Sequence, residues 1–233
     1  MISQWVVREA NAGMRTNFNL PDGTVVWLNS GSSVTYPEPY EKDQRRVELQ
    51  GEAYFEVTPD PQKPFIVSVR EDRMRIRVLG TAFNVQAYEE EDLVHTTLVS
   101  GKVNLEIRDG QGRTREQVLN PSEKASYDLV GGRMQIVPVN PVYETAWMEG
   151  KLMFRDTPLP DVLKRLSHFY NVRFEMQDAV LEEYRFTGTF IHRQLFEILD
   201  YLKISSNIHY RINQQTEDDS NGIQYTTVVL WKK

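Results

Sequence analysis

The feature that most restricts the fold is a repeat in the C-terminal part of the chain, where residues 36 positions apart have the same character. Each copy contains a strand pattern, an apolar helical pattern, an asparagine and a second strand pattern. Eight positions match: Phe154 with Phe190, Leu159 with Leu195, Val162 with Ile198, Leu163 with Leu199, Leu166 with Leu202, Asn171 with Asn207, Val172 with Ile208 and Phe174 with Tyr210. The repeat predicts two βαβ units whose helices pack against a small sheet.

The end of the chain completes this pattern. Residues from Tyr225 to Trp231 alternate in character and predict a closing strand. The preceding stretch, from Gln214 to Gly222, is acidic and contains no large apolar residue. We expect it to be a mobile surface loop.

The part of the chain before the repeat has a different periodicity. From Phe18 to about Val137, short segments alternate between apolar and polar residues, and turn residues such as Pro21-Asp22-Gly23 separate them. This pattern predicts an all-β sandwich, barrel or solenoid-like stack. The two prolines between Val137 and Pro141 disfavour a helix and a central strand. We predict an all-β domain over residues 1–137, a linker over 138–146 and a C-terminal α+β domain over 147–233.

Charge and cysteine content exclude several functions. The formal net charge of -6 disfavours nucleic-acid binding, which depends on Lys and Arg neutralising phosphates. A chain with no cysteine has no disulfide, thiolate nucleophile or cysteine-ligated metal. No run of about 18 apolar residues is present, and the first residues lack the apolar core of a signal peptide. If the protein works outside the cytoplasm, we expect its export or membrane segment to lie outside this chain.

The sequence offers no convincing catalytic group. Glu52 and Glu56 form the best carboxylate pair, but four strand residues separate them by about 13 Å. Glycosidase carboxylates need roughly 5 to 9.5 Å, so solvated strand-face charges are the better interpretation. The four histidines have no metal-ligand spacing, and the glycine pairs lack the setting of a phosphate loop. We expect no catalytic residue, no bound metal and no cofactor.

Several motifs together resemble a known family. The FecR domain is similar to residues from about Arg15 to Asp128, through LPDGTVVWLNSGSSVTYP, RRVELQGEAYFEV, KPFIV, VLGTAFNVQAY and LVSGKVNLEI. Further on, AWMEGKLMF and TPLPDVLKRLSHFYNV resemble the C-terminal domain that accompanies FecR domains. That domain is itself similar to the secretin and TonB short N-terminal domain. The resemblance covers nearly the whole chain.

The resemblance implies a regulatory function. FecR-type proteins are single-pass inner-membrane anti-sigma factors, and this chain resembles their periplasmic region alone. Their periplasmic region receives a signal from the N-terminal signalling domain of an outer-membrane TonB-dependent transporter. The signal then controls an extracytoplasmic-function sigma factor, which is held by a cytoplasmic segment absent from this chain.

Such a relay needs a surface that binds the transporter domain. An exposed strand edge can accept a partner strand, and aromatic and β-branched strands of the C-terminal domain are the candidates. The candidate partner-binding residues are Tyr184, Phe186, Thr187, Tyr225, Thr227, Val229 and Trp231. The alternative is that both strands are internal.

Two other functions compete with this interpretation. Exposed aromatic residues would favour a carbohydrate-binding or periplasmic enzyme module, with Trp27, Tyr36, Tyr40 and Tyr54 as the candidates. A purely structural β-stack would lack a partner surface. Residues upstream of Met1 distinguish these possibilities, because the regulator requires a transmembrane helix and a cytoplasmic helical segment there.

Overall fold

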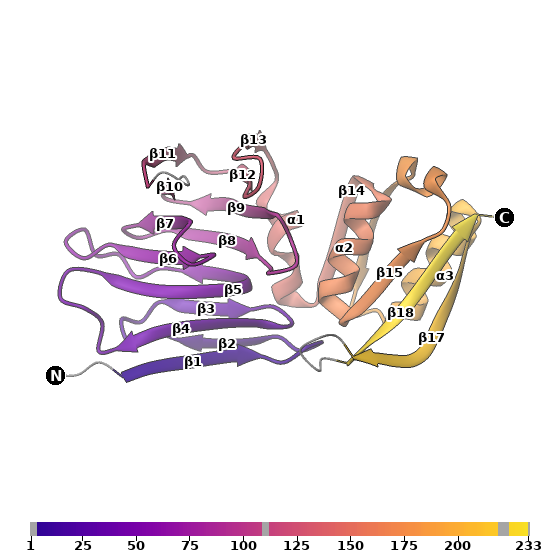
Figure 1. The fold of residues 1–233 in the computed structure, drawn as a ribbon, viewed down its shortest axis with the longest axis horizontal. Coiled ribbons are helices and arrows are strands. Elements are labelled where there is room, and N and C mark those ends of the chain that lie inside the picture. Colours follow the sequence, from indigo (N-terminus) through magenta and orange to yellow (C-terminus); the bar gives the residue numbers. More distant parts are fainter. Residues whose placement is uncertain (1–3, 109–111, 219–223, 233) are drawn as a thin grey trace. The chain divides into compact units, whose positions relative to one another are not determined.

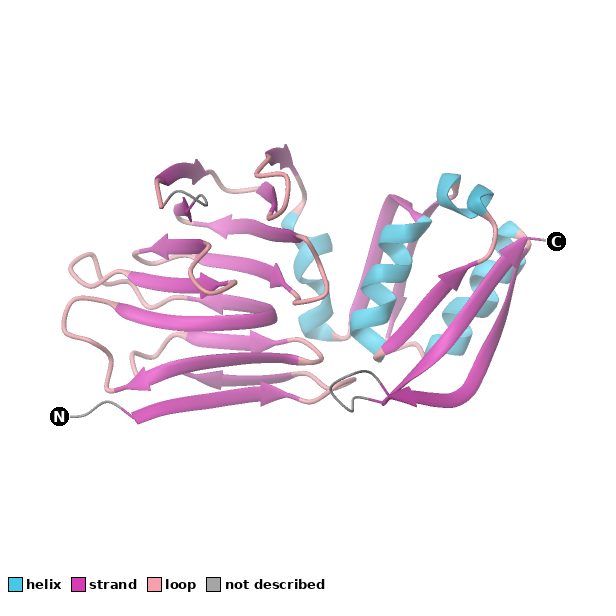
Figure 2. Ribbon diagram, in the orientation of Figure 1, coloured by secondary structure: helices cyan, strands magenta, loops and turns pink. Residues whose placement is uncertain are grey.

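The computed structural model describes residues 4–108, 112–218 and 224–232. The chain divides into two compact units, Met1–Thr145 and Ala146–Lys233 (Figure 1). Strands dominate the first unit, and helices and strands alternate in the second (Figure 2). Within the described ranges, no helix has the length and apolar character needed to cross a membrane. The expected classes, all-β followed by α+β, are confirmed.

The described part of the first unit contains thirteen hydrogen-bonded strands, stacked as expected from the alternation. One layer has the order β11-β10-β7-β6-β5-β4-β1, and the other has the order β13-β12-β9-β8-β5-β3-β2. The strands are β1 (Gln4–Ala10), β2 (Thr16–Asn19), β3 (Val25–Leu28), β4 (Ser32–Glu38), β5 (Arg45–Glu56), β6 (Phe65–Val69), β7 (Met74–Val78), β8 (Ala82–Ala87), β9 (Leu93–Ser100), β10 (Val103–Arg108), β11 (Thr114–Leu119), β12 (Glu123–Asp128) and β13 (Met134–Pro138).

Strand β5 belongs to both layers and joins them. Its first residues pair with β6 and β4, and its residues from Gly51 onward pair with β8 and β3. Gly51 lies at the change of layer with a φ of 87°. A Cβ atom on this residue would lie 2.3 Å from Ser32 Oγ and 2.9 Å from Ser32 Cα. Only glycine therefore fits this crossing without displacing β4.

The space between the layers is filled by apolar side chains from both. The ring of Phe55 lies 5.8 Å from that of Phe65 and 5.3 Å from that of Phe83, measured between centroids, and all three are fully buried. Burying each such side chain contributes about 1.5–3 kcal/mol. Phe55 comes from the second half of β5, so the crossing strand also supplies the centre of the core.

Replacing Gly51 with Ala tests the role of the crossing. We expect Gly51→Ala to lower the free energy of unfolding by roughly 2–4 kcal/mol, because left-handed backbone strain and the clash with Ser32 add together. Gly132→Ala is the matched control, since Gly132 also has a positive φ, 66°, but nothing lies within 4 Å of its Cβ position. Denaturant unfolding measures both variants, and an equal loss would show that the contact with Ser32 is unimportant.

The second unit contains the two predicted repeats. Each has the order strand, helix, strand, and each helix ends at the expected asparagine, with φ values of 54° at Asn171 and 52° at Asn207. The elements are η1 (Ala146–Glu149), β14 (Lys151–Pro158), α2 (Leu159–Tyr170), β15 (Val172–Met176), η2 (Ala179–Glu183), β16 (Arg185–Ile191), α3 (Leu195–Ser206), β17 (Ile208–Asp218) and β18 (Gln224–Lys232), where η denotes a 3-10 helix.

The strands of one repeat do not share a sheet. The first strands of the two repeats, β14 and β16, pair with each other in a two-stranded antiparallel sheet. The second strands, β15 and β17, lie on either side of β18 in a three-stranded sheet. Both helices bury their apolar residues: Leu159, Val162, Leu163, Leu166 and Phe169 on α2, and Ile198, Leu199 and Leu202 on α3.

Three local expectations differ from the structure. The predicted linker contains the end of β13 and a short helix, α1 (Pro141–Thr145), because Pro138 closes an edge strand and Pro141 opens a helix, where no N–H is needed. The Glu144 carboxylate accepts a 2.9 Å hydrogen bond from Lys124, which ties α1 to β12.

The expected loop from Gln214 is strand as far as Asp218, and residues 219–222 lie outside the described ranges. Strand β1 was not predicted.

Candidate partner-binding surface

The expected partner-binding residues lie in two different sheets of the second unit. Phe186 and Thr187 belong to β16, and Tyr184 immediately precedes it. Thr227, Val229 and the other C-terminal candidates belong to β18. The two groups therefore have different access to a partner strand.

Strand β18 is not an edge. It pairs with β15 from Thr226 to Leu230, and with β17 from Gln224 to Lys232 with one irregularity. Its backbone groups are used on both sides, so the expectation that a partner strand adds along Tyr225–Trp231 is wrong. Alternation identified a strand here, but alternation does not reveal strand order within a sheet.

Three of the β18 candidates nevertheless share one face of the sheet. Thr227, Val229 and Trp231 alternate along the strand, and Thr227 and Val229 are only 3% and 4% exposed. Trp231 stacks on His209 of β17, with 5.9 Å between ring centroids. Register partners on the same face add charge beside this row, with Glu175 and Arg211 on either side of Val229. Tyr225 lies in the same strand, and its side chain is outside the described part.

The candidates near β16 are more accessible. Thr187 is exposed, and its hydroxyl accepts a 2.9 Å hydrogen bond from the backbone N–H of Asp156. Phe186 is buried and points into the unit. Tyr184 is half-buried, and the ammonium group of Lys232 lies 4.9 Å from its ring centroid. This cation–π contact links the two candidate strands at one point.

The backbone of β16 has one free side among the described residues. His192 N–H donates to Gly150 O at 3.1 Å, and Leu159 N–H donates to Tyr184 O at 2.7 Å. In an antiparallel pair, alternate residues point their backbone groups to the same side, so even-numbered positions of β16 face β14. The odd-numbered positions Thr187, Thr189 and Ile191 therefore present N–H and C=O groups to the free edge, and their side chains are exposed.

The first unit contains a buried carboxylate that the sequence did not reveal. Glu52 is 3% exposed, although it was expected to be a solvated strand-face charge. Its carboxylate accepts hydrogen bonds from Asn29 Nδ2 at 2.7 Å, Asn84 Nδ2 at 2.8 Å and Gln86 Nε2 at 2.9 Å. The Glu52 backbone also accepts from Asn29 N–H at 3.0 Å. The hint in the sequence was an asparagine directly after one apolar strand segment, Asn29, and another within a second such segment, Asn84.

This network holds together three strands at the layer crossing. Glu52 follows Gly51 directly, and its N–H donates to Ser32 Oγ at 2.8 Å. Burial raises the pKa of the nearby Tyr88 hydroxyl, and the negative charge of Glu52 raises that pKa further. Glu52 therefore acts as a structural anchor, with both carboxylate oxygens occupied by amide donors.

Removing the charge of Glu52 tests this role. We expect Glu52→Gln to lower the free energy of unfolding by about 2–4 kcal/mol. In this variant one carboxylate oxygen becomes an NH₂ group, which is itself a donor. It would face the side-chain amide donors that bind the carboxylate in the parent. Glu56→Gln, four residues away on the exposed end of β5, is the matched control and should change stability by less than about 0.5 kcal/mol. Equal urea midpoints for the two variants would contradict the anchoring role.

A polar groove lies on the first unit where β5 leaves its first layer. Its volume is about 570 Å³, and its lining includes Ser33, Gln50, Ser68, Arg70 and Glu89. Charges of both signs line it, so it has no strong preference for an anion or a cation.

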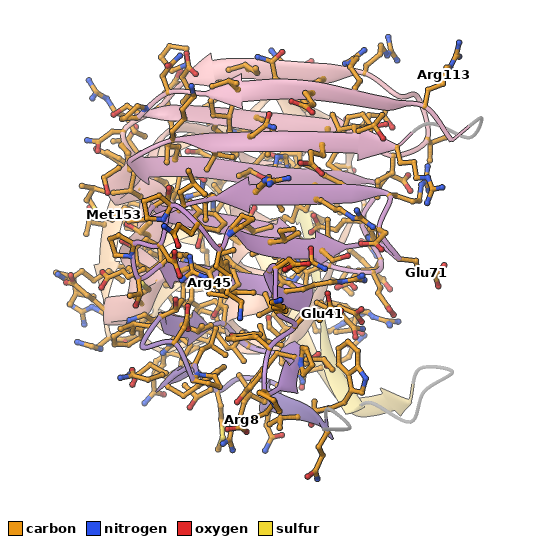
Figure 3. The ribbon with its side chains drawn as sticks, turned by 90° about the vertical axis from the view of Figure 1, so that its left-hand side faces the viewer. Arg8, Glu41, Arg45, Glu71, Arg113 and Met153 are labelled. Carbon is orange, nitrogen blue, oxygen red and sulfur yellow. The ribbon has the colours of Figure 1, made fainter. Side chains whose placement is uncertain are left out.

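The rim of this groove is the β6–β7 turn, which has an unusual backbone. Arg70, Glu71 and Asp72 have φ values of 53°, 52° and 64°, a conformation that costs about 1–2 kcal/mol for each residue with a side chain. Arg70 holds the turn by donating to the backbone oxygens of Tyr88, Glu89 and Glu91. Glu71 projects outward from the strand ends in Figure 3. The turn is thus fastened by its first arginine.

Asp72 also stabilises this turn. Two hydrogen bonds from Arg75, at 2.9 and 2.8 Å, lower the pKa of Asp72 to about 2 against the effect of burial, with smaller contributions from Ser68 and Arg46. A carboxyl group with a depressed folded-state pKa adds stability above its unfolded pKa, and that stability disappears as the pH falls toward 2.

We expect Asp72→Asn to lower the free energy of unfolding by about 1–2 kcal/mol at pH 7, and the deficit to shrink between pH 4 and pH 2. Urea unfolding of the parent and the variant across this pH range measures the effect. Asp43→Asn, at an exposed position, is the control. A deficit that stays constant down to pH 2.5 would show that the ionised carboxylate is not its source.

The described residues contain little that resembles a catalytic or carbohydrate site. In the three described ranges, no group of three or more His, Asp or Glu side chains is arranged to hold a metal ion. Tyr36 and Tyr54 are buried, and Trp27 and Tyr40 are half-buried. These residues therefore do not form the exposed aromatic surface that the alternative carbohydrate-binding function would need, because they fill the space within and beside the core.

Comparisons with known proteins identify both units. The family model described as FecR protein matches residues 7–104, and the model described as FecR, C-terminal matches residues 151–217. A comparison with curated proteins found no match. Two crystal structures of a candidate anti-sigma factor from Parabacteroides distasonis ATCC 8503, at 1.65 and 2.50 Å resolution, are similar to the chain.

The similarity to these structures extends over the full chain. The first shares 31% identity and covers 98% of this chain and 99% of its own, with a TM-score of 0.81. The second shares 30% identity and covers 99% and 100%, with a TM-score of 0.80. Both units and the two similar structures thus point to one class of protein, the anti-sigma regulators. The chain belongs to the FecR family of anti-sigma factors.

Proposed function

We propose that this chain is the periplasmic, signal-receiving region of a single-pass inner-membrane anti-sigma factor. In this role it binds the N-terminal signalling domain of an outer-membrane TonB-dependent transporter. The signal passes to an extracytoplasmic-function sigma factor, which is bound by a cytoplasmic segment outside this chain. The observation that carries the proposal is the match of both units, in order, to the two FecR models.

The proposed relay works through binding and includes no catalytic step. Glu52, whose carboxylate is the most deeply buried among the described residues of the first unit, accepts hydrogen bonds from three amide donors. A bound transporter domain shifts the regulator between states only if it binds one state more tightly than the other.

We assign the transporter contact to the free edge of β16. Strand addition requires outward N–H and C=O groups, which the odd-numbered residues of β16 supply. Thr187 and Thr189 are β-branched, exposed and adjacent to this edge. We propose no contact through Thr227 and Val229, because both edges of β18 are paired and these two side chains are only 3% and 4% exposed.

Replacing Thr189 with Pro removes one outward N–H while leaving the ladder to β14 intact. We expect Thr189→Pro to weaken binding to the signalling domain of the cognate transporter about tenfold, the equivalent of one or two lost hydrogen bonds. Isothermal titration calorimetry with the whole chain measures the affinity, and circular dichroism checks the fold.

Thr189→Ala is the matched control, since it changes the same side chain but keeps the N–H, and it should bind within about twofold of the parent. A folded Thr189→Pro variant with parental affinity would exclude the β16 edge as the contact. A parent chain that shows no binding to any signalling domain encoded beside it would overturn the proposed function itself.

A further inference from the structure

Strand β1 is an unprotected edge in the first unit. It pairs only with β4 among the described strands, and its seven residues have one unpaired backbone side. It lies at the end of the stack in Figure 1, and Arg8 marks it in Figure 3. Trp5 and Val7, which share one face of the strand, are 54% and 52% exposed.

The other terminal strands of the stack are protected against pairing. Strand β11 has exposed charges at Arg115 and Glu116, β13 ends at Pro138, and β2 has only four residues. Charged residues, proline and short length are the usual means by which proteins block edge pairing. Strand β1 also has exposed charges, at Arg8 and Glu9, but it is the longest of these four end strands and has two large apolar residues that are more than half exposed.

The core is also open at this end. Val6 of β1 and Phe18 of β2 pack against the core but remain only partly buried. A stack of β-strands needs a cover at its end, because each step of the stack buries its apolar side chains against the next step. A partner strand beside β1 would extend the first layer and increase the burial of Val6.

The sequence of β1 is complementary to itself. In an antiparallel pair related by a two-fold axis through Val7, the opposing residues are Val7 with Val7, Val6 with Arg8, Trp5 with Glu9 and Gln4 with Ala10. This register uses all seven residues, opposes no like charges and places Trp5 diagonally beside Val7 of the other copy. Axes through Arg8 or Glu9 would instead place like charges directly opposite each other.

We propose that β1 is a self-association surface, and that two copies of this chain pair antiparallel through β1 with Val7 at the two-fold axis. The first layer then continues across the dimer as one sheet. This proposal concerns the first unit and does not depend on the transporter contact.

Sedimentation velocity over a range of concentrations tests the proposal with the whole chain. We expect a concentration-dependent dimer for the parent and its loss in Val7→Lys, because the two lysines would face each other at the axis. Val130→Lys is the matched control, since Val130 is an exposed valine in a turn of the same unit, and it should dimerise like the parent.

Cross-linking tests the register. The chain has no cysteine, so Val7→Cys introduces a single thiol. Under mild oxidation we expect Val7→Cys to form disulfide-linked dimers at least tenfold faster than Val130→Cys, because opposed strand residues have Cβ atoms about 4.5–5.5 Å apart. A parent that stays monomeric at all concentrations, a Val7→Lys variant that still dimerises, or equal cross-linking rates would each overturn the proposal.

Discussion

The first unit depends on one strand that changes layer. Gly51 lets β5 cross beside Ser32, and Glu52, the next residue, binds amide groups from β8 and from the residue after β3. Phe55, three residues later, fills the centre of the core. Five consecutive residues of β5 thus contain the glycine that permits the crossing, the buried carboxylate and the central aromatic ring of the core. The groove on the first layer exists because β5 leaves that layer, so the surface also derives from this crossing.

Local periodicity predicted what depends on local contacts. The helices of the second unit ended at Asn171 and Asn207 as expected, because asparagine tolerates the left-handed conformation that closes a helix. The alternating segments of the first unit became strands. The repeat predicted the order of elements in both copies, although not that their strands would separate into two sheets.

The sequence failed where long-range pairing decides the outcome. Nothing in the alternation of β18 distinguishes a central strand from an edge, and both positions suit β-branched residues. Glu52 resembled a surface charge because its amide donors come from residues up to 34 positions away. Two prolines suggested an irregular linker, but each occupies a place where its missing N–H costs nothing. For the candidate site, alternation and residue type predicted the strands. Only the pairing pattern shows which of these strands has a free edge.

The central position of β18 makes the second unit dependent on the last strand described. Strands β15 and β17 do not pair with each other, and each is joined to the sheet only through β18. During synthesis, both remain unpaired until the residues of β18 have been added. Such distant contacts slow folding and leave apolar strands open to proteases and to aggregation. Cutting the chain short within β18 would remove the pairing partner of both β15 and β17, and with it the three-stranded sheet as a whole.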